Sequence, residues 1–189
     1  MFNILDEGER PSPMHSYILC HIIFDVKMVL TRKSRYVATG FHSPKSDEIR
    51  YKVVVSREIL CIAFIYATIN GIDILASDIQ NAYITAPCYE NCWTICVPEF
   101  GSEHESKKDI IVRDLYGLPC MGNNFWYLLR NSVKHFKFDS FPDDPGVWLC
   151  SAIHSGDETY YEYMLLYIDG CLWVSDNGER VMMDLDKYF

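Results

Sequence analysis

The stretch Tyr163-Met-Leu-Leu-Tyr-Ile-Asp169-Gly170-Cys-Leu-Trp-Val174 decides the fold of this chain. It predicts two short apolar strands joined at Asp169-Gly170, because Asp-Gly between β-forming residues favours a tight hairpin. Most such hairpins carry no chemistry. A hairpin tip can also present a carboxylate to a metal ion, provided that a second carboxylate comes from elsewhere in the chain. Asp78, near the end of the apolar run 72–79, is the candidate.

The composition indicates one globular domain. The chain has 189 residues, of which 49% are hydrophobic and 14% aromatic, and this excludes a disordered chain. The net charge of −9 argues against a nucleic-acid partner on average. Segment 27–57 departs from that average, with eight basic residues against the acidic Asp47 and Glu48. This segment is either a surface that faces phosphates or a solvated loop.

The cysteines and the apolar runs indicate an intracellular protein with reduced thiols. Most of the eight cysteines lie inside apolar runs, and no basic signal peptide precedes them. No run approaches the roughly 20 apolar residues of a membrane span, so we expect no membrane partner. The spacing Cys88-x3-Cys92-x3-Cys96 suggests zinc, but a fourth His or Cys ligand is missing nearby, which disfavours that interpretation.

The order of predicted elements indicates an α+β fold, with helices that back a largely antiparallel sheet. Residues 1–15 are polar and predict a loose leader, followed by strands on both sides of the basic residues 32–35. The apolar run 72–79 lacks alternation and predicts a strand buried on both faces. Further strands are expected at 93–97, 110–113, 147–150 and 160–174.

Three helices are predicted from their ends and their apolar spacing. Ser56 can cap a helix that ends at Asn70-Gly71. Its expected buried stripe consists of Ile59, Ile62, Ala63, Tyr66 and Ile69. A second helix is expected from a cap at residue 123 or 124 to about residue 136, and a third begins at about residue 181.

Asp78 and Asp169 form a plausible pair because each lies at the end of an apolar strand. Two carboxylates a few ångströms apart repel by roughly 1–4 kcal/mol, so a divalent cation is needed to hold them together. Mg²⁺ prefers oxygen ligands and substrate phosphates, and a two-ion arrangement serves phosphoryl-transfer polymerases. The alternative is two unrelated aspartates in surface turns.

Four motifs resemble the reverse transcriptase of copia-type LTR retrotransposons. Asp78-Ile-Gln-Asn-Ala-Tyr83-Ile, Leu115-Tyr-Gly-Leu118 and Tyr167-Ile-Asp-Gly170 are similar, in order and spacing, to three palm motifs. Thr31-Arg-Lys-Ser-Arg35-Tyr-Val-Ala-Thr-Gly40 resembles the fingers segment. The resemblance implies a fingers/palm domain over residues 16–189, with a mostly antiparallel palm sheet, a partial fingers region and no thumb.

The resemblance implies two-metal nucleotidyl transfer by an RNA-directed DNA polymerase. Asp78 and Asp169 would be the catalytic ligands of Mg²⁺ or Mn²⁺, and the main-chain carbonyl of Ile79 would be a further ligand. The implied partners are an RNA or DNA template-primer and deoxynucleoside triphosphates.

The resemblance also implies a nucleotide-binding set. Lys33 and Arg35 would hold the triphosphate, for which the planar donor fork of arginine is well suited. Tyr83 would exclude a 2′-hydroxyl, and Gly117 would let the backbone approach the nucleotide or template. Each residue has a structural alternative: Tyr83 as a core aromatic, Arg35 as a surface charge and Gly117 as a turn residue.

Two departures from the family pattern predict that this fragment is inactive. The family has two consecutive aspartates at the hairpin tip, whereas Gly170 follows Asp169 here and removes a carboxylate. Pro119 stands where the family usually has lysine. The chain also ends about one helix after the hairpin, so the other domains of the polyprotein are missing. This pattern indicates a fragment or a decayed copy.

Two alternatives stay open from the sequence. The chain is a non-catalytic nucleic-acid-binding remnant that uses segment 27–57, or a globular domain without a nucleic-acid role. The basic segment favours the first, and the net charge of −9 favours the second.

Overall fold

The computed structural model describes residues 2–39, 54–154, 157–168 and 170–187. The fold is α+β, and the chain divides into two compact units. Unit 1 comprises Met1–Tyr51 and Tyr83–Phe125, and unit 2 comprises Lys52–Ala82 and Trp126–Phe189. The expected fingers/palm domain over residues 16–189 includes parts of both units and stays a prediction.

Unit 1 contains a four-stranded sheet in the order β1-β7-β6-β2. Its strands are β1 (Phe2–Ile4), β2 (Ser16–Tyr17), β6 (Cys92–Ile95) and β7 (Lys108–Ile111), and a short 3₁₀ helix covers Pro98–Phe100. Strands β2 and β6 are parallel, and the other pairs are antiparallel. The core contains the buried residues Ile18, Cys20, Ala38, Cys92, Ile111, Leu115, Leu118 and Cys120.

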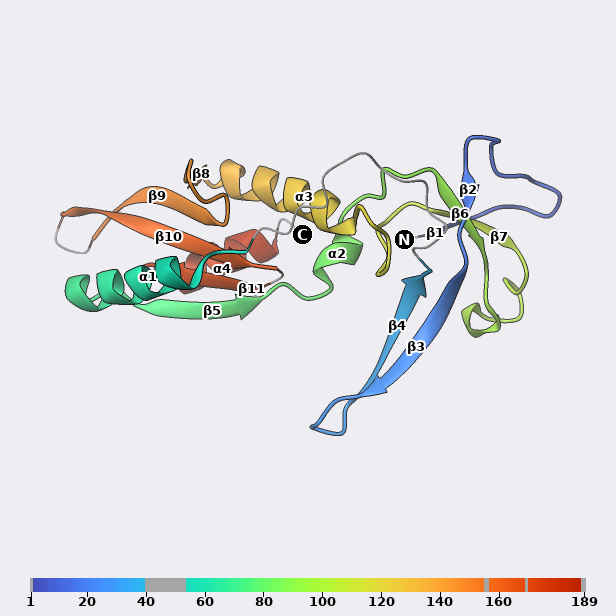
Figure 1. Ribbon diagram of the computed structural model, residues 1–189, viewed down its shortest axis with the longest axis horizontal. Helices are drawn as coiled ribbons and strands as arrows, with labels where there is room; N and C mark the ends of the chain where they lie inside the picture. Colours follow the sequence, from blue (N-terminus) through green and yellow to red (C-terminus); the bar gives the residue numbers. More distant parts are fainter. Residues whose placement is uncertain (1, 40–53, 155–156, 169, 188–189) are drawn as a thin grey trace. The chain divides into compact units, whose positions relative to one another are not determined.

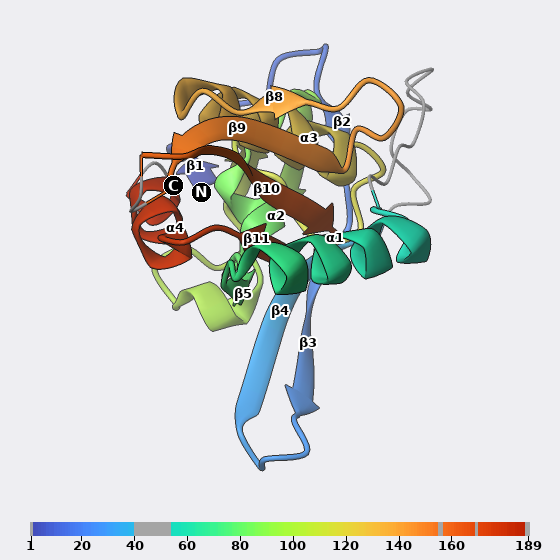
Figure 2. The same cartoon turned by 90° about the vertical axis from the view of Figure 1, so that its left-hand side faces the viewer.

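A separate hairpin of β3 (Cys20–Val26) and β4 (Arg32–Ala38) extends away from the four-stranded sheet of unit 1 (Figures 1 and 2). An isolated β-bridge between Val37 and Tyr116 joins this hairpin to the rest of unit 1. The base of the hairpin is buried at Cys20 and Ala38. Its far end is exposed.

The expected loose leader contains strand β1, so that prediction is wrong at Phe2–Ile4. Phe2 pairs with Ile111 of β7, and its ring lies edge-on to Tyr36 and Phe100 at 5.7 and 5.2 Å. A strand of three residues is too short for an alternation pattern, and its partners lie far along the sequence.

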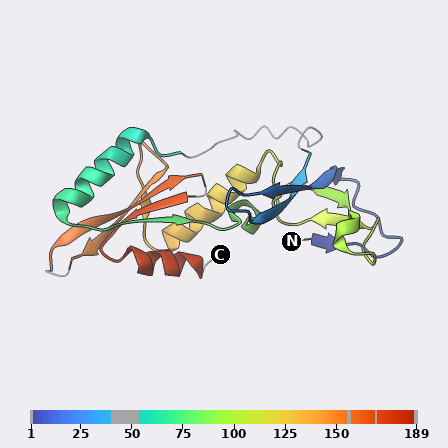
Figure 3. The same cartoon turned by 90° about the horizontal axis from the view of Figure 1, so that it is seen from below.

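Unit 2 contains a five-stranded antiparallel sheet in the order β5-β11-β10-β9-β8. Its strands are β5 (Ile74–Asp78), β8 (Asp139–Ser140), β9 (Val147–Ile153), β10 (Thr159–Tyr167) and β11 (Gly170–Val174). The α-helices in the described ranges are α1 (Arg57–Asn70), α2 (Ala82–Thr85), α3 (Met121–His135) and α4 (Gly178–Asp186). Helices α1 and α4 cover opposite faces of the unit 2 sheet (Figure 3).

Helix α1 has the predicted ends and part of the predicted buried face. Ser56 Oγ accepts a hydrogen bond from the Ile59 amide at 3.2 Å, and Gly71 ends the helix at φ +66°. Ala63 and Ala67 are buried, and Ile59 and Tyr66 of the predicted stripe pack against the same core. The other two stripe residues, Ile62 and Ile69, are 63% and 77% exposed, so the prediction is wrong for them. The helix is apolar almost all round, so periodicity does not mark the contact face. The two alanines do, because small side chains allow close packing.

Two further predictions were wrong for reasons of topology. Strand β5 is half-exposed because it lies at the edge of its sheet, where β11 is its one neighbour among the described strands. Helix α3 begins at Met121, so Asn124 lies inside the helix and is not its cap. The Asn124 side chain is buried and donates a hydrogen bond to Asp114. Among the described residues, no helix is long and apolar enough to cross a membrane.

Candidate functional site

The proposed metal ligand Asp78 lies at the end of strand β5, opposite the start of β11. The antiparallel register pairs Asp78 with Gly170 and Ile74 with Val174. Within the described part of the chain, the exposed Asp78 carboxylate has no hydrogen-bond or ion-pair partner. Asp169, the other predicted ligand, lies outside the described residues. The two motifs are therefore related through Gly170, which pairs with Asp78 and follows Asp169 in the sequence.

The main-chain carbonyl of Ile79 can still contribute to this site. It accepts a hydrogen bond from the Ala82 amide at 3.3 Å, at the beginning of α2. A carbonyl oxygen has two lone pairs, so one remains for a ligand. The described groups that could bind a cation at this end of β5 are the Asp78 carboxylate and the Ile79 carbonyl. Both would bind through oxygen atoms, which suits a hard cation such as Mg²⁺.

The hairpin between β10 and β11 is shifted by one residue from the prediction. Tyr167 pairs with Gly170, so β10 ends at Tyr167 and Gly170 already belongs to β11. Ile168 has φ +62°, a backbone conformation that β-branched residues rarely adopt. Such strain costs on the order of 1–3 kcal/mol and is concentrated at functional sites. The strained position directly precedes Asp169.

Three of the predicted nucleotide-binding residues gather around Tyr116 in unit 1. The Arg35 guanidinium lies 5.9 Å from the centre of the Tyr116 ring, within the range of a cation–π contact. The Tyr83 ring lies edge-on to Tyr116 at 5.9 Å and to Phe125 at 5.6 Å. Gly117 follows Tyr116 in the chain. Tyr116 thus connects residues from three separate motifs.

Gly117 is required by the close approach of two backbone segments. Its φ is +94°, and a Cβ atom there would lie 2.0 Å from the carbonyl oxygen of Ala38. The Ala38 amide also donates to the Tyr116 carbonyl at 2.7 Å. The segment that Gly117 approaches is therefore strand β4, which also contains Lys33 and Arg35. Packing explains this glycine without a nucleotide.

Lys33 and Arg35 lie on the same face of β4, because they are two residues apart in a strand. Arg35 is held near Tyr116, whereas Lys33 has no ion pair or hydrogen bond from its side chain within the described ranges. Both side chains are partly exposed. Together they form a cationic stripe that an anionic group can reach.

A buried carboxylate directly precedes the Tyr116 segment. Asp114 is fully buried, and Asn124 Nδ2 donates to its Oδ1 at 3.1 Å. Burial raises the pKa of Asp114 to about 7, while the hydrogen bond from Asn124 opposes this rise. The Asp114 amide also donates to the Ala86 carbonyl at 3.0 Å. Asp114 therefore anchors the loop that contains Tyr116 and Gly117.

Sequence reasoning missed both Tyr116 and Asp114 as site residues. Tyr116 was part of a quoted motif, and its aromatic type was the signal that a role should have been assigned. Asp114 follows Arg113 and has the sequence context of a solvated charge. No sequence signal reveals that it is buried, because its partner Asn124 lies on a separate helix.

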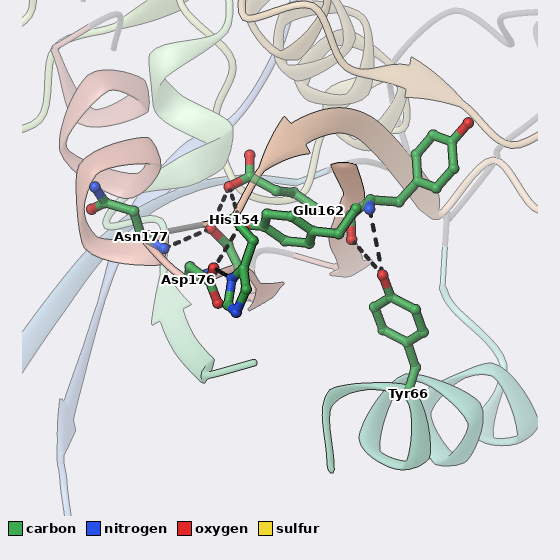
Figure 4. A network of polar contacts seen from close by, with 8 residues as sticks. Tyr66, His154, Glu162, Asp176 and Asn177 are labelled. Atoms are coloured by element: carbon green, nitrogen blue, oxygen red, sulfur yellow. Dashed lines mark hydrogen bonds and ion pairs between the residues drawn. The ribbon is translucent and has the colours of Figure 1, made fainter. Parts of the chain in front are cut away.

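A second polar network lies in unit 2 (Figure 4). The buried Glu162 accepts hydrogen bonds from Tyr160 at 3.1 Å and from Ser175 at 2.6 Å. His154 forms an ion pair with Asp176, and the Asn177 amide donates to Ser175 Oγ at 3.0 Å. These contacts join β10 to the segment between β11 and α4, so we interpret the network as structural.

The same close-up shows how α1 is attached to β10. Tyr66 Oη donates to the carbonyl of Tyr161 at 3.2 Å, and the Tyr161 amide donates back to that hydroxyl at 3.4 Å (Figure 4). The Tyr66 ring also lies edge-on to Tyr163 at 5.1 Å. These contacts fix the helix on its face of the sheet.

The eight cysteines are free thiols. In the described ranges, no group of three or more His, Cys, Asp or Glu side chains has a geometry that could hold a metal ion. The pair of Asp78 and Asp169 is not covered by this finding, because Asp169 is outside those ranges.

No known family model and no curated protein sequence matches this chain. The assignment of the site therefore depends on the motifs and on the geometry of each unit. Unit 1 presents cations beside aromatic rings, and unit 2 presents a carboxylate at a strand end that has no partner among the residues the structure describes.

Proposed function

We propose that this chain is a fingers and palm fragment of a copia-type reverse transcriptase, with Mg²⁺ or Mn²⁺ as its metal. The register of β5 against β11 is the observation that carries the proposal. It pairs Asp78 with Gly170, the residue after Asp169, and so joins two motifs that are far apart in the sequence.

The chain's own residues would divide the work of nucleotidyl transfer. Asp78, Asp169 and the Ile79 carbonyl would hold the cation, which would supply charge neutralisation at the phosphates and activation of the primer hydroxyl. Lys33 and Arg35 would bind the triphosphate. Tyr83, supported by Tyr116 and Phe125, would limit the space at the ribose 2′-position. With these roles, the chain would have a polymerase site in which Gly170 takes the place of the second aspartate of the hairpin.

Primer extension on an RNA template with Mg²⁺ or Mn²⁺ tests the proposal. We expect little extension by the chain itself, more by Gly170→Asp, and none by Gly170→Asp combined with Asp78→Ala. Asp73→Ala in the Gly170→Asp background is the matched control, since Asp73 precedes the opposite end of β5. If Gly170→Asp extends no primer, the chain is not a polymerase. Extension that survives Asp78→Ala would refute the site.

A non-catalytic nucleic-acid-binding remnant is the second candidate. It is favoured by the cations of the β3–β4 hairpin, although residues 40–53 of the basic segment lie outside the described residues. Binding of single-stranded RNA that falls steeply with added salt, without any primer extension, would support this candidate.

A further inference from the structure

The loop between β3 and β4 presents three consecutive aliphatic side chains to solvent. Met28, Val29 and Leu30 are 103%, 77% and 84% exposed. They make no contribution to the core of unit 1. Contiguous exposed apolar groups on a protein surface mark interaction sites. We therefore define Met28, Val29 and Leu30 as the hairpin tip.

The backbone of the tip shows that its composition is unusual for its geometry. The Lys27 amide donates to the Thr31 carbonyl at 3.0 Å, and the Leu30 amide donates to the Lys27 carbonyl at 2.8 Å. Leu30 has φ +59°, the position that glycine normally occupies in a three-residue hairpin loop. A leucine here adds strain without any packing gain. Such local conflicts are expected at functional positions.

The apolar surface continues from the tip along one face of the hairpin. Phe24 and Val26 are both exposed, and they share a face because they are two residues apart in β3. Val26 pairs with Arg32, so a cation stands beside the apolar residues on that face.

Unpaired cations surround the tip. The side chains of Lys27, Arg32 and Lys33 have no hydrogen-bond or ion-pair partner in the ranges that the structure describes. Asp25 is a nearby acidic residue, and its Oδ1 accepts a hydrogen bond from the Val26 amide at 2.8 Å. A hollow of about 510 Å³ lies against the hairpin, lined by Phe24, Asp25, Val26, Arg32, Lys33 and Ser34. Its size and cations suit an anionic group.

We propose that the hairpin tip inserts into the surface of a lipid bilayer that contains anionic headgroups. The aliphatic tip would enter the boundary between headgroups and acyl chains, and the cations behind it would bind headgroup phosphates or carboxylates. The three tip side chains are aliphatic and lack the flat face on which nucleic-acid bases stack, so acyl chains are the better match for the tip. Phe24 is an exposed aromatic ring on the adjoining face, and it lies four residues before the tip.

This inference differs from the sequence expectation of no membrane partner. That expectation was based on the lack of a spanning stretch, whereas an inserted hairpin lies on the bilayer and needs none. The inference is independent of polymerase activity. The tip residues were not assigned to the metal or nucleotide site, so vesicle binding and primer extension can fail separately.

Co-sedimentation of the full chain with vesicles tests the inference. We expect binding to phosphatidylcholine vesicles that contain phosphatidylserine, and weak binding to phosphatidylcholine alone. Replacing all three tip residues by serine should lower the partition coefficient by about tenfold or more. Replacing Lys27 and Arg32, neither of which was assigned to the nucleotide site, by glutamine should lower it by about fivefold per cation. The fully exposed tip has no packing to lose, so the serine variant should fold normally.

Ile69→Ser is the matched control. Ile69 is also aliphatic and exposed, but it lies on α1 in unit 2, away from the hairpin sequence. Its replacement should leave vesicle binding unchanged. Absence of binding by the unaltered chain, or equal binding by the serine tip variant, would overturn the inference. It is also overturned if the serine tip variant loses single-stranded RNA binding, because the tip would then be a nucleic-acid surface.

Discussion

The two parts of the candidate site differ in how far packing contacts explain their residues. In unit 1, Gly117 permits close backbone contact with Ala38, and Tyr83 packs against Tyr116 and Phe125. In unit 2, Asp78 lies exposed at the end of β5, without a side-chain partner in the described part of the chain. Packing alone can explain Gly117 and Tyr83 of unit 1. It does not explain Asp78, which is therefore the more informative match.

The largest expected effect is that of Gly117→Ala. The new Cβ atom would lie 2.0 Å from a backbone oxygen at φ +94°, so we expect a loss of about 4 kcal/mol or more in the free energy of unfolding. Gly8→Ala is the control, because Gly8 has φ +95° and no atom within 4 Å of a new Cβ. It should cost about 1 kcal/mol. Equal losses for both variants in urea denaturation would show that the contact with Ala38 is unimportant.

Asp114→Asn should change the pH dependence of stability. The folded pKa of Asp114 is about 7, above its ordinary value of 3.8, so the folded state binds its proton more tightly than the unfolded state. The protonated Asp114 carboxyl therefore contributes to the free energy of unfolding. This contribution is fully present below pH 3.8 and is lost as pH rises through about 7. It amounts to on the order of 4 kcal/mol.

The Asn variant should therefore lose much less stability between pH 5 and pH 8 in urea denaturation. Some dependence should remain, because burial also raises the pKa of Asp109 to about 6, with the same sign. An unchanged slope in the variant would mean that the Asp114 carboxyl is already ionised, or solvated, in the folded state.

The smallest effect on stability is expected for Asp78→Asn. An exposed side chain without partners should change the free energy of unfolding by no more than about 0.5 kcal/mol. The same substitution should abolish any Mn²⁺ binding that isothermal titration calorimetry detects with the unaltered chain. A destabilisation above about 1 kcal/mol would show that Asp78 has a structural role, and the contrast between the two units would then disappear.

Local signals predicted much of the fold. Ser56 and Gly71 marked the ends of α1 because capping and a left-handed stop depend on neighbouring residues. The sequence from Tyr163 to Val174 predicted a hairpin for a similar reason, although the connection is shifted by one residue. Strand β1 was missed because its stability comes from pairing with β7, which is distant in the sequence.

The candidate site was less predictable than the fold. The motifs named Asp78, Arg35, Tyr83 and Gly117, but the contacts of Gly117 with Ala38 required the structure. The burial of Asp114 also depends on how separate segments pack. Sequence periodicity carries no information about such contacts.

The edge position of β5 has a consequence for the behaviour of the chain in solution. An edge strand offers backbone groups to which another chain can add a strand, and charged side chains on the edge discourage this. Asp78 is the exposed charge of β5. A neutral residue there would remove electrostatic repulsion between copies, so self-association would increase while the fold of each copy stays intact. Asp78, the proposed metal ligand, would thus also oppose the association of copies through this strand.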